Sequence, residues 1–227
     1  MASTNKCTYC GKEFAKARTL QVHLCEPKRR YLQRDEKWVV NAFMVFQRFY
    51  QIHQHNSKLK TYDEFVKSAY YNAFVKFGRF IMHINPLYPD RYIDFVLRSK
   101  IKLDHWARDD LYETYLIEAL KSETVEAALQ RSIATMMDWA TEQNAQWSDY
   151  FRLVNTNRAV QHIQQGKISP WLLLGCKAGK RMLKSFNDEQ LQMIERFINP
   201  SFWPSKLKSY PADHMLVQDT AREAKIV

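Results

Sequence analysis

Residues 7–30 read CTYCGKEFAKARTLQVHLCEPKRR, and their spacing is the most informative pattern in the chain. Cys7 and Cys10 are separated by two residues, and His23 and Cys25 follow within a further fifteen residues. Three of the four cysteines therefore fall within nineteen residues. Thiolates and imidazole are the ligands that tetrahedral zinc prefers, so the spacing predicts a Zn²⁺ site formed by Cys7, Cys10, His23 and Cys25.

The place of Cys25 in this site depends on where the preceding helix ends. Residues two apart on a helix point to nearly opposite sides, so His23 and Cys25 can share one metal ion only if the helix ends at His23. Pro27 favours such a break, because a proline disfavours the helical conformation in the residue before it. The alternative is a metal-free hairpin with incidental cysteines, which would leave reactive thiols exposed.

The same stretch resembles a Cys2His2-type zinc finger up to His23. The pattern Cys-x2-Cys-x3-Phe-x5-Leu-x2-His puts Phe14 and Leu20 where that family has its small core, and it covers about a tenth of the chain. The chain departs from the family at the fourth ligand, because Cys25 follows His23 after only one residue. The resemblance implies that Lys16 faces the bases. One finger covers about three base pairs, so sequence-specific reading by this module alone is not expected.

Positive charge is concentrated near the N-terminus. The chain has a net charge of +10, and residues 1–60 carry +8 of it, with twelve Lys/Arg against four Asp/Glu. A basic segment beside a metal module indicates a polyanionic partner, most simply nucleic acid. We expect the phosphate contacts to come from six basic residues: Lys12, Lys16, Arg18, Lys28, Arg29 and Arg30. The alternatives are a basic surface that only aids solubility, and a finger that binds protein or is purely structural.

Composition and periodicity predict an all-α protein. The chain contains five glycines, fewer than a β-sandwich or a phosphate-cradling α/β enzyme usually needs, and 46% of its residues are apolar. Apolar residues recur at helical spacing, and no strand-like alternation of useful length occurs. We expect a small zinc knuckle with a basic tail at residues 1–30, followed by a multi-helix domain at residues 31–227 with a possible subdivision near residues 140–156.

Several helix boundaries are marked by capping residues. Thr61 and Glu64 predict a capping box that opens one helix over residues 62–84. Ser169 and the proline after it predict an N-cap that opens one helix over residues 170–186. Four further N-caps are expected at Asp90, Asp104, Ser122 and Asp188.

Catalytic motifs are missing from the sequence: it contains no phosphate-binding loop, no HExxH and no GxSxG. Asp104, Asp109 and Asp110 suggest acid–base or metal chemistry, but acidic residues at a helix start are also what the helix dipole favours. We therefore expect no catalytic activity, and a metal-dependent nuclease stays an alternative. The lack of a signal-peptide core and of a long apolar run predicts a soluble intracellular protein with no membrane partner.

Two segments in the last third of the chain carry a second resemblance. They are Gly166-Lys167-Ile168-Ser169 before Leu172-Leu173-Leu174, and Trp203 before Lys206-Leu207-Lys208-Ser209-Tyr210. Over about sixty residues, these features are similar to helicase-loading and replication accessory proteins of T-even-type tailed bacteriophages. The resemblance implies a two-part helical protein that binds forked or single-stranded DNA and recruits a helicase. It does not extend to the N-terminal finger, which those loaders lack.

Together these features predict a zinc-containing, basic, non-catalytic nucleic-acid-binding accessory protein. DNA is favoured over RNA, and the expected protein partner is a helicase or polymerase component. A role in phage DNA replication, in the host cytoplasm, follows from the second resemblance. The alternative is a protein–protein adaptor, such as a transcription or virion-assembly factor, whose zinc finger is structural.

Overall fold

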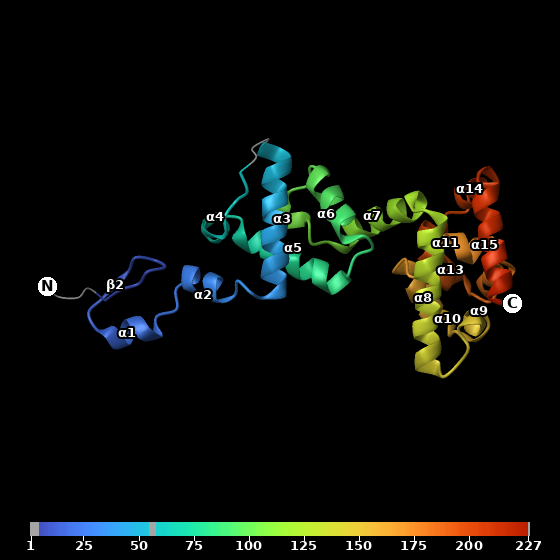
Figure 1. Cartoon of the computed structure of the whole chain (residues 1–227), viewed down its shortest axis with the longest axis horizontal. Helices are drawn as coiled ribbons and strands as arrows, with labels where there is room; N and C mark the ends of the chain where they lie inside the picture. Colours follow the sequence, from blue (N-terminus) through green and yellow to red (C-terminus); the bar gives the residue numbers. More distant parts are fainter. Residues whose placement is uncertain (1–4, 55–57, 227) are drawn as a thin grey trace. The chain divides into compact units, whose positions relative to one another are not determined.

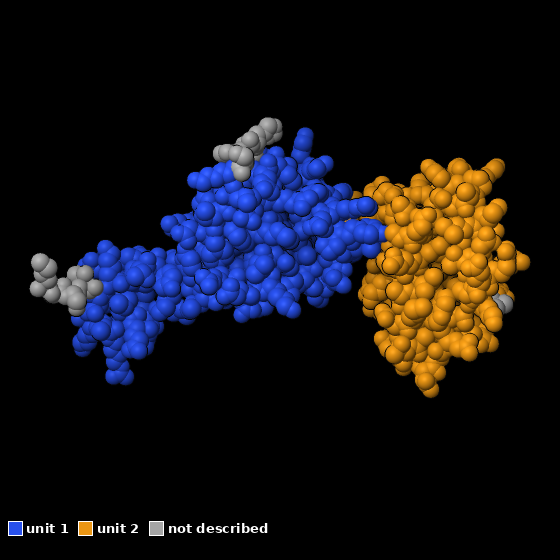
Figure 2. Space-filling view, viewed as in Figure 1, with its two compact units in different colours: residues 1–112 blue, residues 113–227 orange. Residues whose placement is uncertain are grey.

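The computed structural model describes residues 5–54 and 58–226. Within these residues the chain forms fifteen α-helices, two short 3-10 helices and one two-stranded sheet (Figure 1). The predicted all-α class is therefore confirmed. The chain divides into two compact units, unit 1 at residues 1–112 and unit 2 at residues 113–227 (Figure 2).

The division between the units falls inside a helix, α7 (Asp109–Ser122). The sequence suggested a possible subdivision near residues 140–156, and that stretch lies within unit 2. Helix-breaking residues are the signals from which a subdivision is inferred, and a boundary inside a continuous helix carries none.

Unit 1 begins with a hairpin and a short helix, and continues as a helical body. Before α7 its elements are β1 (Asn5–Lys6), β2 (Glu13–Phe14), α1 (Ala17–Val22), α2 (Glu26–Leu32), α3 (Lys37–Gln54), α4 (Tyr62–Lys67), α5 (Tyr71–Ile84), α6 (Pro89–Arg98) and the 3-10 helix η1 (Leu103–His105). We call residues 5–25 the knuckle.

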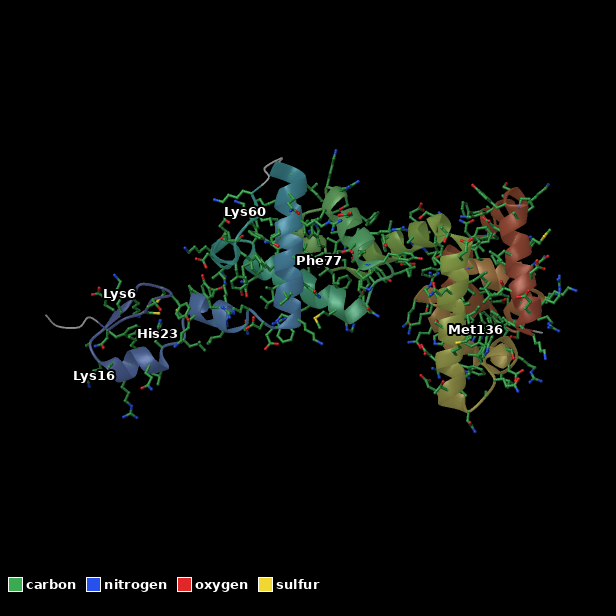
Figure 3. The ribbon with its side chains drawn as sticks, in the orientation of Figure 1. Lys6, Lys16, His23, Lys60, Phe77 and Met136 are labelled. Carbon is green, nitrogen blue, oxygen red and sulfur yellow. The ribbon has the colours of Figure 1, made fainter. Side chains whose placement is uncertain are left out.

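Helices α3 and α5 pack closely at the centre of unit 1. The ring of Phe46 lies 5.1 Å from that of Phe65 and 5.3 Å from that of Phe74, and all three side chains are buried. Phe77, labelled in Figure 3, is also fully buried. A Cβ at Gly78 would lie 2.3 Å from the carbonyl oxygen of Trp38, so the two helices approach at a distance that only glycine permits.

Unit 2 consists of helices alone among the residues that the structure describes. After α7 its elements are α8 (Val125–Gln143), the 3-10 helix η2 (Trp147–Asp149), α9 (Tyr150–Leu153), α10 (Thr156–Gln164), α11 (Pro170–Gly175), α12 (Lys177–Leu183), α13 (Asp188–Ile198), α14 (Trp203–Ser209) and α15 (Pro211–Glu223).

The core of unit 2 is built around two tryptophans. The rings of Trp171 and Trp203 meet edge to face at 5.8 Å, and both side chains are buried. The indole N–H of Trp203 donates to the Phe197 carbonyl at 2.9 Å. The ammonium of Lys206 lies 5.1 Å from the centre of the Trp171 ring, and burial lowers the pKa of this lysine. Both tryptophans are therefore core residues.

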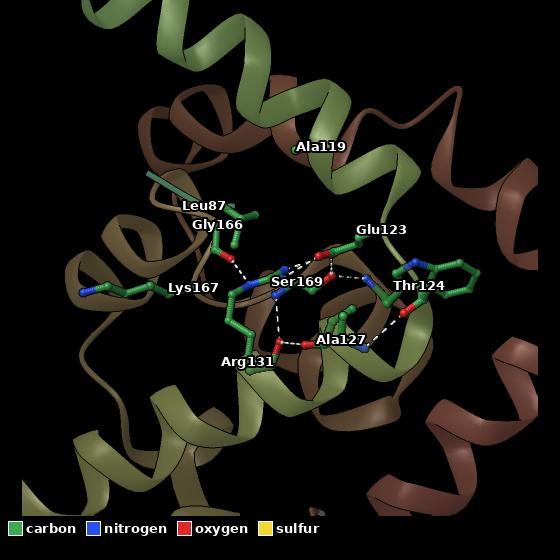
Figure 4. A network of polar contacts seen from close by, with 12 residues as sticks. Leu87, Ala119, Glu123, Thr124, Ala127, Arg131, Gly166, Lys167 and Ser169 are labelled. Carbon is green, nitrogen blue, oxygen red and sulfur yellow. Dashed lines mark hydrogen bonds and ion pairs between the residues drawn. The ribbon is translucent and has the colours of Figure 1, made fainter. Parts of the chain in front are cut away.

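A buried ion pair fixes the segment before α11. Arg131 contacts Glu123 with both terminal nitrogens, at 2.6 and 2.8 Å, and its Nε donates to the Gly166 carbonyl at 2.6 Å (Figure 4). The Ser169 hydroxyl donates to the same carboxylate at 2.7 Å, while its backbone N–H donates to the Ser132 hydroxyl at 2.9 Å. Gly166 and Ser169 are thus held by a hydrogen-bonded network within unit 2.

The two strongest capping predictions are confirmed. The Thr61 hydroxyl accepts from the backbone N–H of Glu64, whose side chain accepts from the backbone of Thr61 in return. Ser169 caps α11 ahead of Pro170.

Four predicted N-caps are wrong. α6 starts two residues earlier than expected, with Tyr88 as N-cap, and α13 starts one residue earlier, with Asn187 as N-cap. Asp90 and Asp188 therefore lie in the first turn of their helices. Acidic side chains are favoured both at the N-cap and in the first turn of a helix. The residue type alone therefore does not show which of these positions an aspartate takes. The remaining corrections are that Asp104 lies in η1, that Ser122 is the last residue of α7, and that Thr124 caps α8.

Two helices that the sequence predicts as continuous are interrupted. The chain leaves the helical conformation at Ser68, between α4 and α5, and again at Cys176, between α11 and α12. At the second break a Cβ on Gly179 would lie 2.2 Å from the Leu173 carbonyl oxygen, so α11 and α12 pack directly on each other. Neither break carries a proline, so local sequence does not reveal it.

Candidate metal centre

The four predicted ligands lie in two short connections. Cys7 and Cys10 are in the turn between β1 and β2, and His23 and Cys25 are in the segment between α1 and α2. β1 and β2 pair antiparallel, with Asn5 opposite Phe14. The backbone N–H of Gly11 donates to the Cys7 carbonyl at 2.8 Å, and Gly11 has a φ of 74°, which suits glycine. This turn directs both cysteines to one side of the hairpin.

The break that the spacing requires after α1 is present. α1 ends at Val22, and His23 has an extended backbone with a ψ of 120°. Cys25 is the N-cap of α2, and its side chain makes no capping hydrogen bond. The chain therefore turns between His23 and Cys25, which leaves the Cys25 sulfur free to face the other three ligands.

The four side chains form one compact group. Their ligand atoms all lie within 4.8 Å of one another. The sulfurs of Cys7 and Cys25 are 3.8 Å apart, and the Cys10 sulfur is 3.3 Å from Nε2 of His23. Figure 3 labels His23 on the segment that follows α1. The group could hold a metal ion, and it has the number and type of donors that a four-coordinate site requires.

The electrostatics of the cysteines differ within the group. The backbone N–H of Cys10 holds the pKa of Cys7 below its ordinary value against the opposing effect of burial. For Cys10, the backbone N–H of Lys12 lowers the pKa, but burial and the sulfurs of Cys7 and Cys25 together raise it above its ordinary value. The neighbouring sulfurs thus oppose the ionisation of Cys10, and a central cation would reverse that effect.

Apolar packing in the knuckle is slight. Among its described residues Cys7 alone is buried, and the two finger-core residues, Phe14 and Leu20, are half-buried. The Phe14 ring lies 4.7 Å from the ring of His23, so its main contact is with a ligand. A piece of this size with so little buried surface needs a metal or another crosslink to hold its shape.

The six predicted phosphate-contacting residues separate into two groups. Lys12, Lys16, Arg18 and Arg29 are exposed, and none of them forms an ion pair with a described residue. Figure 3 labels Lys16, which is the N-cap of α1. The geometry therefore leaves these four side chains available to a ligand.

Lys28 and Arg30 are engaged within the chain. Lys28 donates to the His23 carbonyl at 3.0 Å. The Arg30 guanidinium lies 4.3 Å from the centre of the Tyr71 ring, pairs with Glu26 and donates to the Val66 carbonyl. Arg30 therefore ties α2 to α4 and α5, a role that its position in a basic run does not reveal.

Sequence reasoning missed three polar residues on α5. Asn72, Lys76 and Arg79 are exposed and share one face of the helix at positions i, i+4 and i+7. They line a cavity together with Arg29 and Arg30 of α2. The helical spacing was visible in the sequence, but the pairing with residues more than forty positions earlier was not.

The acidic residues considered for catalysis do not form a metal site. Within the described parts of the chain, the knuckle contains the one group of three or more His, Cys, Asp or Glu side chains close enough to share an ion. Asp110 instead pairs with Arg108 at 2.5 Å.

No protein-family model, curated protein or solved structure matches this chain. None of its described helices combines the length and the hydropathy needed to cross a membrane.

Proposed function

We propose that the chain is a zinc-containing, non-catalytic accessory protein that binds nucleic acid, with DNA as the favoured polymer. A role in phage DNA replication, with a helicase or polymerase component as protein partner, is the most specific form of this proposal. The observation that carries it is the presence of exposed, unpaired cations on a knuckle whose four donor side chains could hold a metal ion.

The donor set supports zinc as the metal. A tetrahedral zinc with Zn–S bonds of about 2.3 Å holds two sulfurs about 3.8 Å apart. The Cys7 and Cys25 sulfurs have a separation of 3.8 Å. Three thiolates and one imidazole fill all four positions, and closed sites of this kind are structural, whereas catalytic zinc keeps one position open. The proposed role of the metal is therefore to hold the knuckle in shape.

The charge distribution supports a polyanion as ligand. Lys12, Lys16 and Arg18 are exposed side chains without an ion-pair partner in the described structure. Lys6, in contrast, is paired with Glu13 at 3.8 Å. Unpaired cations attract phosphates, and their binding releases the counterions that are condensed on the nucleic acid. No internal ion pair has to be broken for this contact.

A salt series tests this proposal. Fluorescence anisotropy with labelled single-stranded DNA, duplex DNA and RNA gives the slope of log affinity against log salt. Each lost phosphate contact lowers the slope by about 0.7 on a single strand and about 0.9 on a duplex. The Lys12→Gln/Lys16→Gln/Arg18→Gln variant is expected to lose about 2 units of slope on a single strand.

Lys6→Gln is the matched control, because it removes a charge of the same knuckle that is already paired. It is expected to leave the slope close to that of the wild type. Absence of binding to all three polymers at low salt would contradict the proposal.

An adaptor function is the second candidate, and exposed apolar residues favour it. Val22 is 75% exposed and Leu24 is 60% exposed, both on the knuckle. Exposed apolar side chains close together are typical of protein contacts. A partner captured by the full chain but lost on Val22→Ser/Leu24→Ser, with nucleic-acid binding unchanged, would support the adaptor.

A further inference from the structure

Unit 1 contains a cavity of about 410 Å³ between α2 and α5. Its polar walls are formed by Arg29, Arg30 and Gln33 from the end of α2, and by Asn72, Lys76 and Arg79 from α5. The cavity thus joins two segments that are distant in sequence, and it is separate from the four metal ligands.

The lining of the cavity carries four cations and no acidic side chain. Arg30 is neutralised by its ion pair with Glu26. Arg29, Lys76 and Arg79 form no ion pair with any residue in the described ranges, although Lys76 approaches the Asp104 carbonyl at 3.5 Å. Like charges around one hollow repel one another, and an anion between them removes the repulsion.

Buried polar atoms at the cavity also lack partners. Tyr71 lines it and is 3% exposed, and its hydroxyl makes no hydrogen bond to a described residue. The Nε of Arg30 is buried and likewise without a partner in the described structure. A buried donor left unsatisfied costs about 1–3 kcal/mol, so a small shift of these side chains toward an acceptor in the cavity would be stabilising.

The pKa of Tyr71 is consistent with the gathering of cations at this wall. Burial raises the pKa of Tyr71, while the neighbouring Tyr62 hydroxyl and the guanidinium groups of Arg30, Arg29 and Arg79 oppose that rise. Three arginines from two helices therefore act on one phenol at the cavity wall.

The backbone of α5 adds a favourable field. Tyr71 and Asn72 are the first two residues of this 14-residue helix, which has no acidic residue in its first turn and no side-chain cap. A helix N-terminus carries partial positive charge and unpaired N–H groups, both of which favour an anion.

The cation-bearing helix is held firmly from behind. Gly78 packs against the backbone of Trp38 on α3, and the Arg79 guanidinium lies 5.5 Å from the centre of the Trp38 ring. A wall fixed in this way presents its charges without a large ordering cost.

We infer that the α2–α5 cavity is a phosphate-binding site that holds a backbone phosphate of a nucleic-acid strand. Arg29, Lys76 and Arg79 supply the charge, and Asn72, Gln33 and the Tyr71 hydroxyl supply neutral donors. Arginine suits this role because its planar fork can give two parallel hydrogen bonds to one phosphate. The inference rests on the proposed function, and it places a second phosphate contact outside the knuckle.

The test uses the full chain and two exposed residues of α5. Lys76→Gln/Arg79→Gln is expected to lower the salt slope by about 1.4 on single-stranded DNA, the amount for two lost contacts. Arg98→Gln is the control, since Arg98 is exposed, lies in unit 1 and does not line the cavity. The charge-retaining variant Lys76→Arg/Arg79→Lys is expected to restore the slope. Unchanged thermal unfolding shows that the variants fold.

The outcomes separate the two proposals. A wild-type slope in Lys76→Gln/Arg79→Gln, combined with a reduced slope in the knuckle variant, overturns the cavity assignment and keeps the proposed function. A chain that binds no nucleic acid, but is stabilised by inorganic phosphate only when Lys76 and Arg79 are present, overturns the proposed function and keeps a phosphate site. Loss of affinity confined to 5′-phosphorylated strands, with 5′-hydroxyl strands unaffected, overturns a backbone phosphate in favour of a terminal one.

Discussion

The knuckle and unit 2 achieve stability by opposite means. In the knuckle Cys7 is the one buried residue among those described, whereas unit 2 buries three tryptophans, Trp139, Trp171 and Trp203, and many aliphatic side chains. Met136, labelled in Figure 3, is fully buried there. The contrast teaches that stability in this chain comes from ligand chemistry where the segment is short, and from burial where the segment is long.

The two regions also treat polar groups differently. The knuckle gathers three thiols and an imidazole, which are donor groups that a cation can bind. Unit 2 buries Glu123 but surrounds it with Arg131 and Ser169, so its charge is compensated within the chain. The first region thus offers a site for an external ion, whereas the second compensates its buried charge within the chain.

Removal of the metal is expected to have the largest effect, and to have it in the knuckle alone. By elemental analysis the wild type is expected to hold one zinc ion per chain, and Cys25→Ser is expected to lose most of it. Structural zinc contributes about 10–16 kcal/mol of apparent binding free energy in finger peptides. Chelation should therefore unfold the knuckle, as seen by loss of its amide signals in NMR spectra.

Cys176→Ser is the matched control for this prediction. Cys176 is a buried cysteine of unit 2 that caps α12, with its sulfur accepting from the Gly179 backbone at 3.3 Å. A serine hydroxyl can accept the same hydrogen bond. Equal zinc loss in both cysteine variants would contradict the assignment of the ligands.

Breaking the buried ion pair is expected to give the next largest effect. Glu123→Ala leaves the Arg131 guanidinium, which is 17% exposed, without its carboxylate. Removal of one partner of a buried pair costs about 3–5 kcal/mol. Chemical unfolding should show this loss in the transition of unit 2, with zinc content unchanged. A loss below about 1 kcal/mol would show that the pair behaves like a surface one.

Acidification is expected to destabilise unit 2 through His162. Burial lowers the pKa of His162 from 6.5 to about 4, and the Tyr150 hydroxyl lies 2.8 Å from its Nδ1. Between these two pKa values the unfolded chain binds more protons, so stability falls as the pH drops from about 6.5 to about 4. The loss is at most about 3 kcal/mol.

The measurement is the free energy of unfolding of wild type and His162→Asn across that pH range. Asparagine can accept the hydrogen bond from Tyr150 but does not titrate there. The variant should lose the part of the pH dependence that comes from His162. Identical pH dependence in the two proteins would exclude His162 as its source.

An exposed ion pair of unit 2 is expected to give the smallest effect. Lys121 pairs with Glu118 at 2.9 Å, and the Glu118 side chain is 63% exposed. Glu118→Gln should change the free energy of unfolding by about 0–1 kcal/mol. A result as large as that of Glu123→Ala would show that pairing, rather than burial, governs the energetics of unit 2.

Local patterns predicted several parts of the structure because short-range chemistry determines them. The Cys/His spacing identified a group that the structure brings within 4.8 Å, and the need for a break at His23 followed from helix geometry alone. The Thr61 capping box and the Ser169 N-cap are likewise local.

Features that depend on tertiary packing could not be predicted in this way. The break at Cys176 accompanies the close approach of Gly179 to Leu173. No single residue in the local sequence predicts this break. Lys76 and Arg79 of α5 form a cluster of cations only together with Arg29, which folding brings to the same cavity. The role of Arg30 as a tie to Val66 also arises only in the folded chain.

Cys25 belongs to two structures at once, since it is both a member of the metal group and the N-cap of α2. The helix that starts there carries Arg29 and Arg30 in its last turn, and both line the cavity. If the proposed metal and anion both bind, the shared helix offers a route for coupling between them, and any such coupling is reciprocal. Whatever factor metal binding adds to the affinity for an anion, the anion adds to the affinity for the metal, so the chain would retain zinc longest while it is bound to its target.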